Sequence, residues 1–107
     1  MNTLELKILP HQYSIHRLLA NYRLPDKLYR KNSFFSFTST DDENSLICES
    51  SLNIKDSVSD DRWSCIKLCG QLNVEETGIW SRITSECSNC DCTVLTVTNY
   101  NIDYFLV

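Results

Sequence analysis

Two pairs of β-branched and aromatic runs constrain the fold of this chain most. The first pair, residues 34–40 and 45–48, is separated by the acidic turn 41–44. The second pair, residues 93–98 and 102–107, is joined by another short polar connection. Residues of these types favour strands, and a short polar link between two such runs is typical of a hairpin. The sequence therefore predicts two β-hairpins.

Two further segments have the alternation of a strand. Residues 3–9 carry Leu4, Leu6 and Ile8 at every second position, and residues 63–69 alternate in the same way. Side chains alternate between the two faces of a strand, so each segment can place its apolar residues on one face of a sheet. We expect one strand before each hairpin.

One segment has the signals of a helix. Asn73 can cap a helix, and Glu76 three residues later completes a capping box. Apolar residues then follow at helical spacing: Ile79, Ile83, Cys87 and Cys90. Asn89 and Asp91 are suitable left-handed residues to end this helix. Residues 16–31 predict only a degenerate helix, because Pro25 interrupts them.

The two halves of the chain resemble each other. Residues 6–10 match residues 66–70 in pattern, and the first hairpin matches the second at nearly the same offset. Each half therefore reads as strand, helix or degenerate helix, strand, strand. The expected organisation is an amino-terminal half over residues 1–49, a Ser/Asp-rich linker over 50–61 and a carboxyl-terminal domain over 62–107.

Composition disfavours several classes of partner. The net charge is −4, and Lys27, Arg30 and Lys31 form the only local basic group, so binding to nucleic acid or to an anionic membrane is disfavoured. The first residues lack the continuous apolar core of a secretory signal, and no segment has the apolar length needed to span a bilayer. We expect a cytoplasmic or nuclear protein.

The cysteines allow two interpretations. Cysteines stay reduced inside the cell, so they are core residues or metal ligands. Cys87, Cys90 and Cys92 could supply three thiolates to zinc, with Cys65 or Cys69 as a fourth. The same cysteines also extend the apolar face of the helix and begin the following strand, which favours core packing without a metal.

No motif indicates catalysis. The sequence contains no phosphate loop, no paired-carboxylate motif and no pairing of a nucleophile with a base. His11 and His16 have no evident partner, so structural roles are expected for both. The sequence predicts a protein that is not an enzyme and carries no cofactor.

A series of short motifs, taken in order, resembles the ACT domain, and most closely its variant in small bacterial ACT proteins and CASTOR-type arginine sensors. These motifs are residues 9–10, 13–18, 34–38, 40–43 and 45–47 in the first half, and 67–73, 77–79, 94–98 and 103–107 in the second. The resemblance implies a ferredoxin-like α+β fold, with helices on one face of an antiparallel sheet. It makes residues 62–107 an ACT domain without the usual last helix and strand, and residues 1–49 a degenerate ACT-like half.

The resemblance also implies a regulatory role and a site. ACT modules bind small ligands, usually amino acids, where modules pack together, and transmit binding to a protein partner or within a homo-oligomer. The ligand would lie between the loop into the helix and the second hairpin, against Asn73, Val74, Glu75, Glu76, Thr77, Gly78, Ile79, Asn99, Tyr100 and Asp103. A helix start suits a ligand carboxylate, and Asp103 could accept from an ammonium or guanidinium group. The alternatives are a ligand-free interaction domain and a small zinc-thiolate protein.

Overall fold

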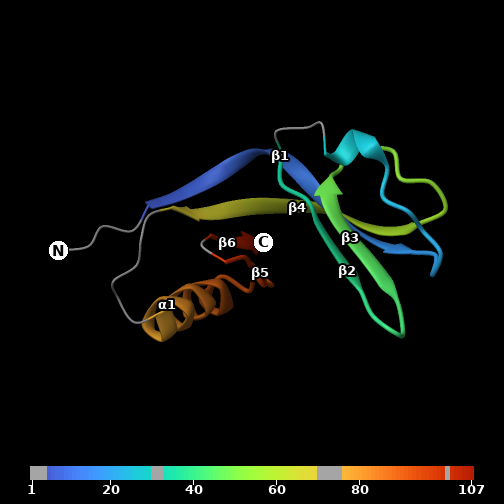
Figure 1. The fold of residues 1–107 in the computed structure, drawn as a ribbon. Helices are drawn as coiled ribbons and strands as arrows, with labels where there is room; N and C mark the ends of the chain where they lie inside the picture. The colour runs from blue at the N-terminus through green and yellow to red at the C-terminus, as the bar shows by residue number, and fades with distance from the viewer. Residues whose placement is uncertain (1–4, 30–32, 70–75, 101) are drawn as a thin grey trace. The chain divides into compact units, whose positions relative to one another are not determined.

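The structure is a computed structural model, and it describes residues 5–29, 33–69, 76–100 and 102–107. Its strands are β1 (Glu5–Leu18), β2 (Ser36–Ser39), β3 (Asn44–Glu49), β4 (Val58–Cys69), β5 (Leu95–Thr98) and β6 (Asp103–Leu106). A short 3-10 helix, η1 (Asp26–Leu28), and one α-helix, α1 (Glu76–Asn89), complete the described part of the chain (Figure 1). No helix within the described ranges has the length and apolar character needed to cross a membrane.

The strands follow the order β2-β3-β1-β4-β6-β5 in one sheet. The pairs β1–β3, β2–β3, β4–β6 and β5–β6 are antiparallel. The chain divides into two compact units, and the two long strands β1 and β4 contribute to both. Unit 1 comprises Met1–Pro10 and Ser64–Val107, and unit 2 comprises His11–Trp63.

Both predicted hairpins are confirmed. β2 and β3 are joined through the acidic turn, where the Thr40 hydroxyl accepts from the amides of Asp42 and Glu43 at 3.2 and 3.0 Å. β5 and β6 form the second hairpin, and the amide of Asn99 donates to the carbonyl of Ile102 at 3.0 Å. Local turn chemistry and β-branched residues were sufficient to predict both hairpins.

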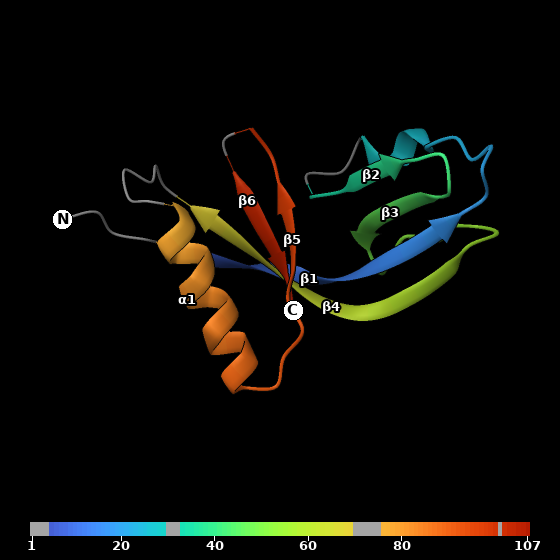
Figure 2. The same ribbon diagram turned by 90° about the horizontal axis from the view of Figure 1, so that it is seen from below.

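The predicted helix is also confirmed over Glu76–Asn89, whereas its proposed capping residue Asn73 lies outside the described residues. The helix ends in a Schellman motif. Asp91 adopts a left-handed φ of 57°, and the amide of Cys92 donates to the carbonyl of Cys87 at 2.8 Å. The helix joins β4 to β5 and lies beside β4, β6 and β5 in both views (Figures 1 and 2).

The expected ferredoxin-like α+β fold, with helices on one face of the sheet, is wrong. The described residues hold six strands and a single α-helix. The degenerate helix expected over 16–31 is replaced by the end of β1 and by η1. β1 continues through Pro10, which can occupy a strand there because the pairing with β3 begins only at Tyr13.

The expected linker over 50–61 contains the start of β4 at Val58. The sequence pattern did not predict this part of β4, because residues 58–62 are exposed and show no alternation of apolar and polar side chains. The division into residues 1–49, 50–61 and 62–107 stays a prediction.

The core of unit 2 lies on one face of β1 and β3. It consists of Leu18, Leu28, Leu46, Cys48 and Ile54. Partly buried side chains surround it: Tyr22, Leu24, Phe35, Phe37 and Leu52. β1 and β3 align His16 with Leu46 and Ser14 with Cys48, so His16 and Ser14 share this face. A polar pair is therefore buried beside the apolar core.

Candidate functional site

The residues that the sequence assigned to a ligand site fall in unit 1. Asn73, Val74 and Glu75 lie outside the described residues. Glu76, Thr77, Gly78 and Ile79 form the first turn of α1. Asn99 and Tyr100 lie in the β5–β6 turn, and Tyr100 is fully exposed. The site as a whole stays a prediction.

Asp103 is a partly enclosed member of this set. It begins β6 and lies opposite Leu68 of β4 on one side and Thr98 of β5 on the other. Leu68 is the next-to-last residue of β4, so Asp103 lies where the chain leaves the sheet toward α1. The register alone places the carboxylate at this end of unit 1.

One oxygen of this carboxylate lacks a partner. Oδ1 of Asp103 is buried and has no hydrogen bond within the described part of the chain. A carboxylate oxygen removed from water without a donor is costly, so such an atom calls for a cation or an N–H group. The chemistry that this position can perform is the binding of a positively charged or hydrogen-bond-donating group.

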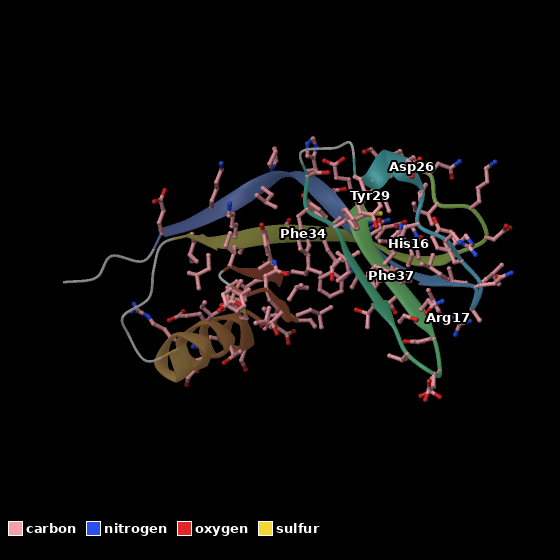
Figure 3. All side chains as sticks on the ribbon, viewed as in Figure 1. His16, Arg17, Asp26, Tyr29, Phe34 and Phe37 are labelled. Atoms are coloured by element: carbon pink, nitrogen blue, oxygen red, sulfur yellow. The ribbon has the colours of Figure 1, made fainter. Side chains whose placement is uncertain are left out.

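A second polar cluster lies in unit 2, and the sequence interpretation missed it. The Ser14 hydroxyl donates to Oδ1 of Asp61 at 2.7 Å and lies 2.6 Å from the hydroxyl of Ser50. His16, two residues along β1, places Nδ1 3.0 Å from the hydroxyl of Ser57. Ser14 and His16 are only 1% and 6% exposed (Figure 3 labels His16). The alternation of residues 14, 16 and 18 was the available signal, but the predicted strand ended at residue 9.

Asp61 is held as an anion in this cluster. Hydrogen bonds from Ser14 and then Ser59 lower the pKa of its carboxyl, and the positive charges available on His16 and Arg62 act in the same direction. The pKa of His16 is lowered, because burial of the ring outweighs the attraction of Asp61 for its protonated form. The pair is therefore a carboxylate beside a neutral imidazole at neutral pH.

The other histidine has a different environment. His11 Nε2 lies 3.1 Å from Oε1 of Glu49, a carboxylate whose side chain is 5% exposed. Glu49 pairs in register with Tyr13, on the opposite face of β1 from His16. The structural roles expected for both histidines therefore correspond to defined polar contacts.

The cysteines do not form a metal site in the described part of the chain. No group of three His, Cys, Asp or Glu side chains among those residues could hold an ion. Cys87 is half-buried, whereas Cys90 and Cys92 are exposed, so the expectation that all three pack in the core is wrong for the last two. Residues 87–92 form the Schellman motif at the end of the helix.

The buried thiols have low reactivity. Cys48 and Cys65 are free and buried, and desolvation raises the pKa of each to about 11. A thiol with so high a pKa is almost entirely protonated at neutral pH and is a poor nucleophile.

The six strands and single α-helix of the described residues define a small, mainly β protein with a partly buried polar cluster. No protein-family model and no curated protein matches the chain. The chain matches the solved structure of protein Atu0741 from Agobacterium tumefaciens, with 34% identity, a TM-score of 0.84, and coverage of 100% of this chain and 79% of that one. The chain therefore belongs to the family of protein Atu0741.

A second solved structure shares the fold. Protein VC0802 from Vibrio cholerae, a protein of unknown function described as a possible transport protein, matches with 16% identity and a TM-score of 0.70, covering 97% of this chain and 77% of that one. Neither structure bears on the resemblance to the ACT domain, so that resemblance stays a prediction without the ferredoxin-like fold that it implied.

Proposed function

We propose that the protein binds an amino acid at the Asp103 end of unit 1. The observation that carries this proposal is the buried, unpartnered Oδ1 atom of Asp103. The ammonium group of an amino acid supplies both the charge and the N–H donors that this oxygen lacks, and charge-assisted hydrogen bonds are among the stronger ones in proteins.

The helix that follows β4 supports the second half of the recognition. The first amides of a helix have no partner within the helix, and the dipole of α1 favours negative charge at Glu76 and the turn after it. A ligand carboxylate can bind there while its ammonium contacts Asp103. A free amino acid carries these two groups with the required opposite charges.

The proposed role is binding without covalent chemistry, with the effect passed to a protein partner. A ligand changes such a partner only if it favours one state of the protein over another. We place the protein in the cytoplasm or nucleus, and the free thiols of Cys48, Cys65, Cys87, Cys90 and Cys92 support a reducing compartment.

A thermal-shift screen of the whole chain against the twenty amino acids tests the proposal. A ligand that binds only the folded state stabilises it by RT ln(1 + [L]/Kd), which is about 2.7 kcal/mol at a hundredfold excess over Kd. We expect at least one amino acid to raise the melting temperature in a concentration-dependent manner. The Asp103→Asn variant should lose that shift, because a neutral amide cannot pair with an ammonium group.

A matched variant controls for the loss of one negative charge. Asp60 is an exposed carboxylate on β4 in unit 2, so Asp60→Asn changes the net charge equally without touching the proposed site. The shift should persist in this variant. No response to any amino acid, or an equal response in Asp103→Asn, would contradict the proposal.

A second candidate function is a ligand-free interaction domain. Leu6 and Ile8 lie on the same face of β1 in unit 1 and are 51% and 71% exposed. Adjacent exposed aliphatic side chains are a common mark of an interface. If this function is correct, the double variant Leu6→Ser, Ile8→Ser should abolish self-association in sedimentation velocity, and the amino acid screen should give no shift.

A further inference from the structure

The side chain of His16 contacts a mostly polar segment, residues 50–57, at the interior of unit 2. The Ser57 hydroxyl donates to the carbonyl of Ile54 at 3.0 Å, so its single proton is already used. It must therefore accept at its contact with His16, where Nδ1 lies 3.0 Å away. This assigns the proton of the neutral ring to Nδ1 and leaves Nε2 as a bare acceptor.

That second ring nitrogen is enclosed. Nε2 of His16 is buried and has no hydrogen-bond partner among the described residues. A neutral imidazole tolerates this state better than an imidazolium does, because protonation at Nε2 would add an unpaired N–H donor and a charge in the same place. The enclosure of Nε2 therefore disfavours the protonated form of His16.

The segment between β3 and β4 depends on this contact. Residues 50–57 carry Ile54, a buried member of the core of unit 2. The outer side of the segment is held by Lys27, whose ammonium donates to the carbonyl of Asn53 at 2.7 Å, an exposed contact. The inner side is held at both ends, by the Ser50 hydroxyl on the Ser14 hydroxyl at 2.6 Å and by Ser57 on His16. Of these contacts, the one to His16 is the contact that a change in pH can alter.

We propose that His16 is a proton-operated latch, in which protonation of Nε2 releases residues 50–57 from the face of β1. The proton comes from solvent and binds the Nε2 lone pair, and Nδ1 keeps its own proton. The ring then carries a positive charge and a second N–H donor. Water solvates the charge and accepts from this donor only when the segment opens and exposes the ring. The proposal is independent of the amino acid site in unit 1.

The charged groups around the ring set the direction of the effect. Asp61 on β4 attracts the cation and opposes opening, but burial has the larger effect on the pKa of His16. From β3, Cys48 shares the face of His16, and burial raises the pKa of its thiol to about 11, so it stays neutral. From the segment before β2, Tyr22 packs against the same core and is neutral too, since burial raises the pKa of its hydroxyl, whereas the charge of Lys27 acts on the Cys48 thiol.

The sign of the pH dependence follows from these groups. The folded pKa of His16 is below the ordinary value of 6.5, whereas in the open segment the ring is hydrated and titrates near that value. Opening therefore takes up a proton as pH falls through 6.5, and acid favours the open state. One proton limits the change to roughly tenfold per pH unit.

Amide hydrogen exchange of the whole chain at pH 7.5 and 5.5, corrected for intrinsic rates, measures the opening. We expect the opening constant of residues 50–57 to rise at the lower pH, by up to roughly tenfold, with β5 and β6 unaffected. In His16→Asn the side-chain amide can replace the Nδ1 donor but cannot be protonated, so the pH dependence should vanish. Unchanged protection in the native chain, or pH dependence that persists in His16→Asn, would overturn the proposal.

A second variant covers the case in which His16→Asn does not fold. Ser57→Ala removes the acceptor for Nδ1, so residues 50–57 should already exchange faster at pH 7.5, and the further increase at pH 5.5 should shrink. A Ser57→Ala protein with native protection at pH 7.5 would contradict the latch. As a control, His11→Asn alters the exposed histidine on the opposite face, and the pH dependence of residues 50–57 should remain.

Discussion

The hydroxyl of Ser14 donates to Oδ1 of Asp61 across 2.7 Å, and this side-chain bond connects β1 to β4 within unit 2. Ser14 is 1% exposed, so its hydroxyl depends on partners within the protein. The same contact is the first cause of the lowered pKa of Asp61. A buried serine thus lowers the pKa of a carboxyl that no sequence motif singles out.

Replacement of Ser14 by alanine should raise the pKa of Asp61 toward its ordinary value of 3.8. Because the folded pKa is lowered, the stability that this group contributes is present above pH 3.8 and is lost as pH falls through the folded value. The variant should therefore lose less stability in acid than the native chain does. Carboxyl-carbon NMR titration measures the pKa directly, and an unchanged value would show that Ser14 does not set it.

Removal of apolar volume from the core of unit 2 should be strongly destabilising. Leu46 is fully buried, so Leu46→Ala should lower the free energy of unfolding by about 2–5 kcal/mol. Leu19 is 55% exposed, and Leu19→Ala should change it by no more than about 0.5 kcal/mol. Urea unfolding of both variants makes the comparison, and similar losses would contradict the assigned core.

The end of α1 should tolerate glycine but not a β-branched residue. Asp91 has a φ of 57°, a conformation that costs an ordinary side chain about 1 kcal/mol and glycine almost nothing. Asp91→Gly should therefore be neutral or stabilising, and Asp91→Val destabilising. Thermal unfolding distinguishes the two, and a valine variant as stable as the glycine variant would show that the Schellman motif does not form.

Thiol modification should separate the cysteines by environment. Cys90 and Cys92 are exposed and should react with iodoacetamide in the folded protein. Cys48 and Cys65 should react only on unfolding, because both are buried with a pKa of about 11. Peptide mass spectrometry after a timed pulse reports each site, and equal labelling of buried and exposed thiols would contradict these assignments.

Local signals in the sequence were sufficient for the hairpins and for α1. Both depend on interactions within a few residues, such as the Thr40 contacts in the β2–β3 turn. The length of β1 and the start of β4 were missed because strand formation there depends on distant pairing partners. Pro10 and the polar residues 59–62 carry no local strand signal. The ferredoxin-like fold was wrong because it required a helix that residues 16–29 do not form.

The candidate sites show the same difference between local sequence signals and contacts of distant segments. Asp103 was singled out from sequence, and the register then placed it opposite Leu68 and Thr98. The contact between Ser14 and Asp61 could not be predicted, because the two residues are 47 positions apart and meet only through the fold. Sequence reasoning identifies residue types, whereas contacts between distant strands require the structure.

The stability of the Asp103→Asn protein distinguishes a binding role from a structural one. A carboxylate oxygen that is buried without a partner destabilises the free protein, so its replacement by an amide should leave the melting temperature unchanged or raise it. If the Asp103 carboxylate instead stabilises the fold, its replacement should lower the melting temperature. Differential scanning calorimetry without ligand makes the measurement, and a clear loss of stability would indicate that Asp103 supports the fold.

Binding of an amino acid beside Asp103 is tested most directly by NMR titration of the isotope-labelled chain with the amino acids. The account predicts saturable shifts of the amides of Leu68, Thr98 and Asp103 and of the first turn of α1, which disappear in Asp103→Asn. A spectrum that does not change with any amino acid, or shifts that persist in the variant, would contradict it.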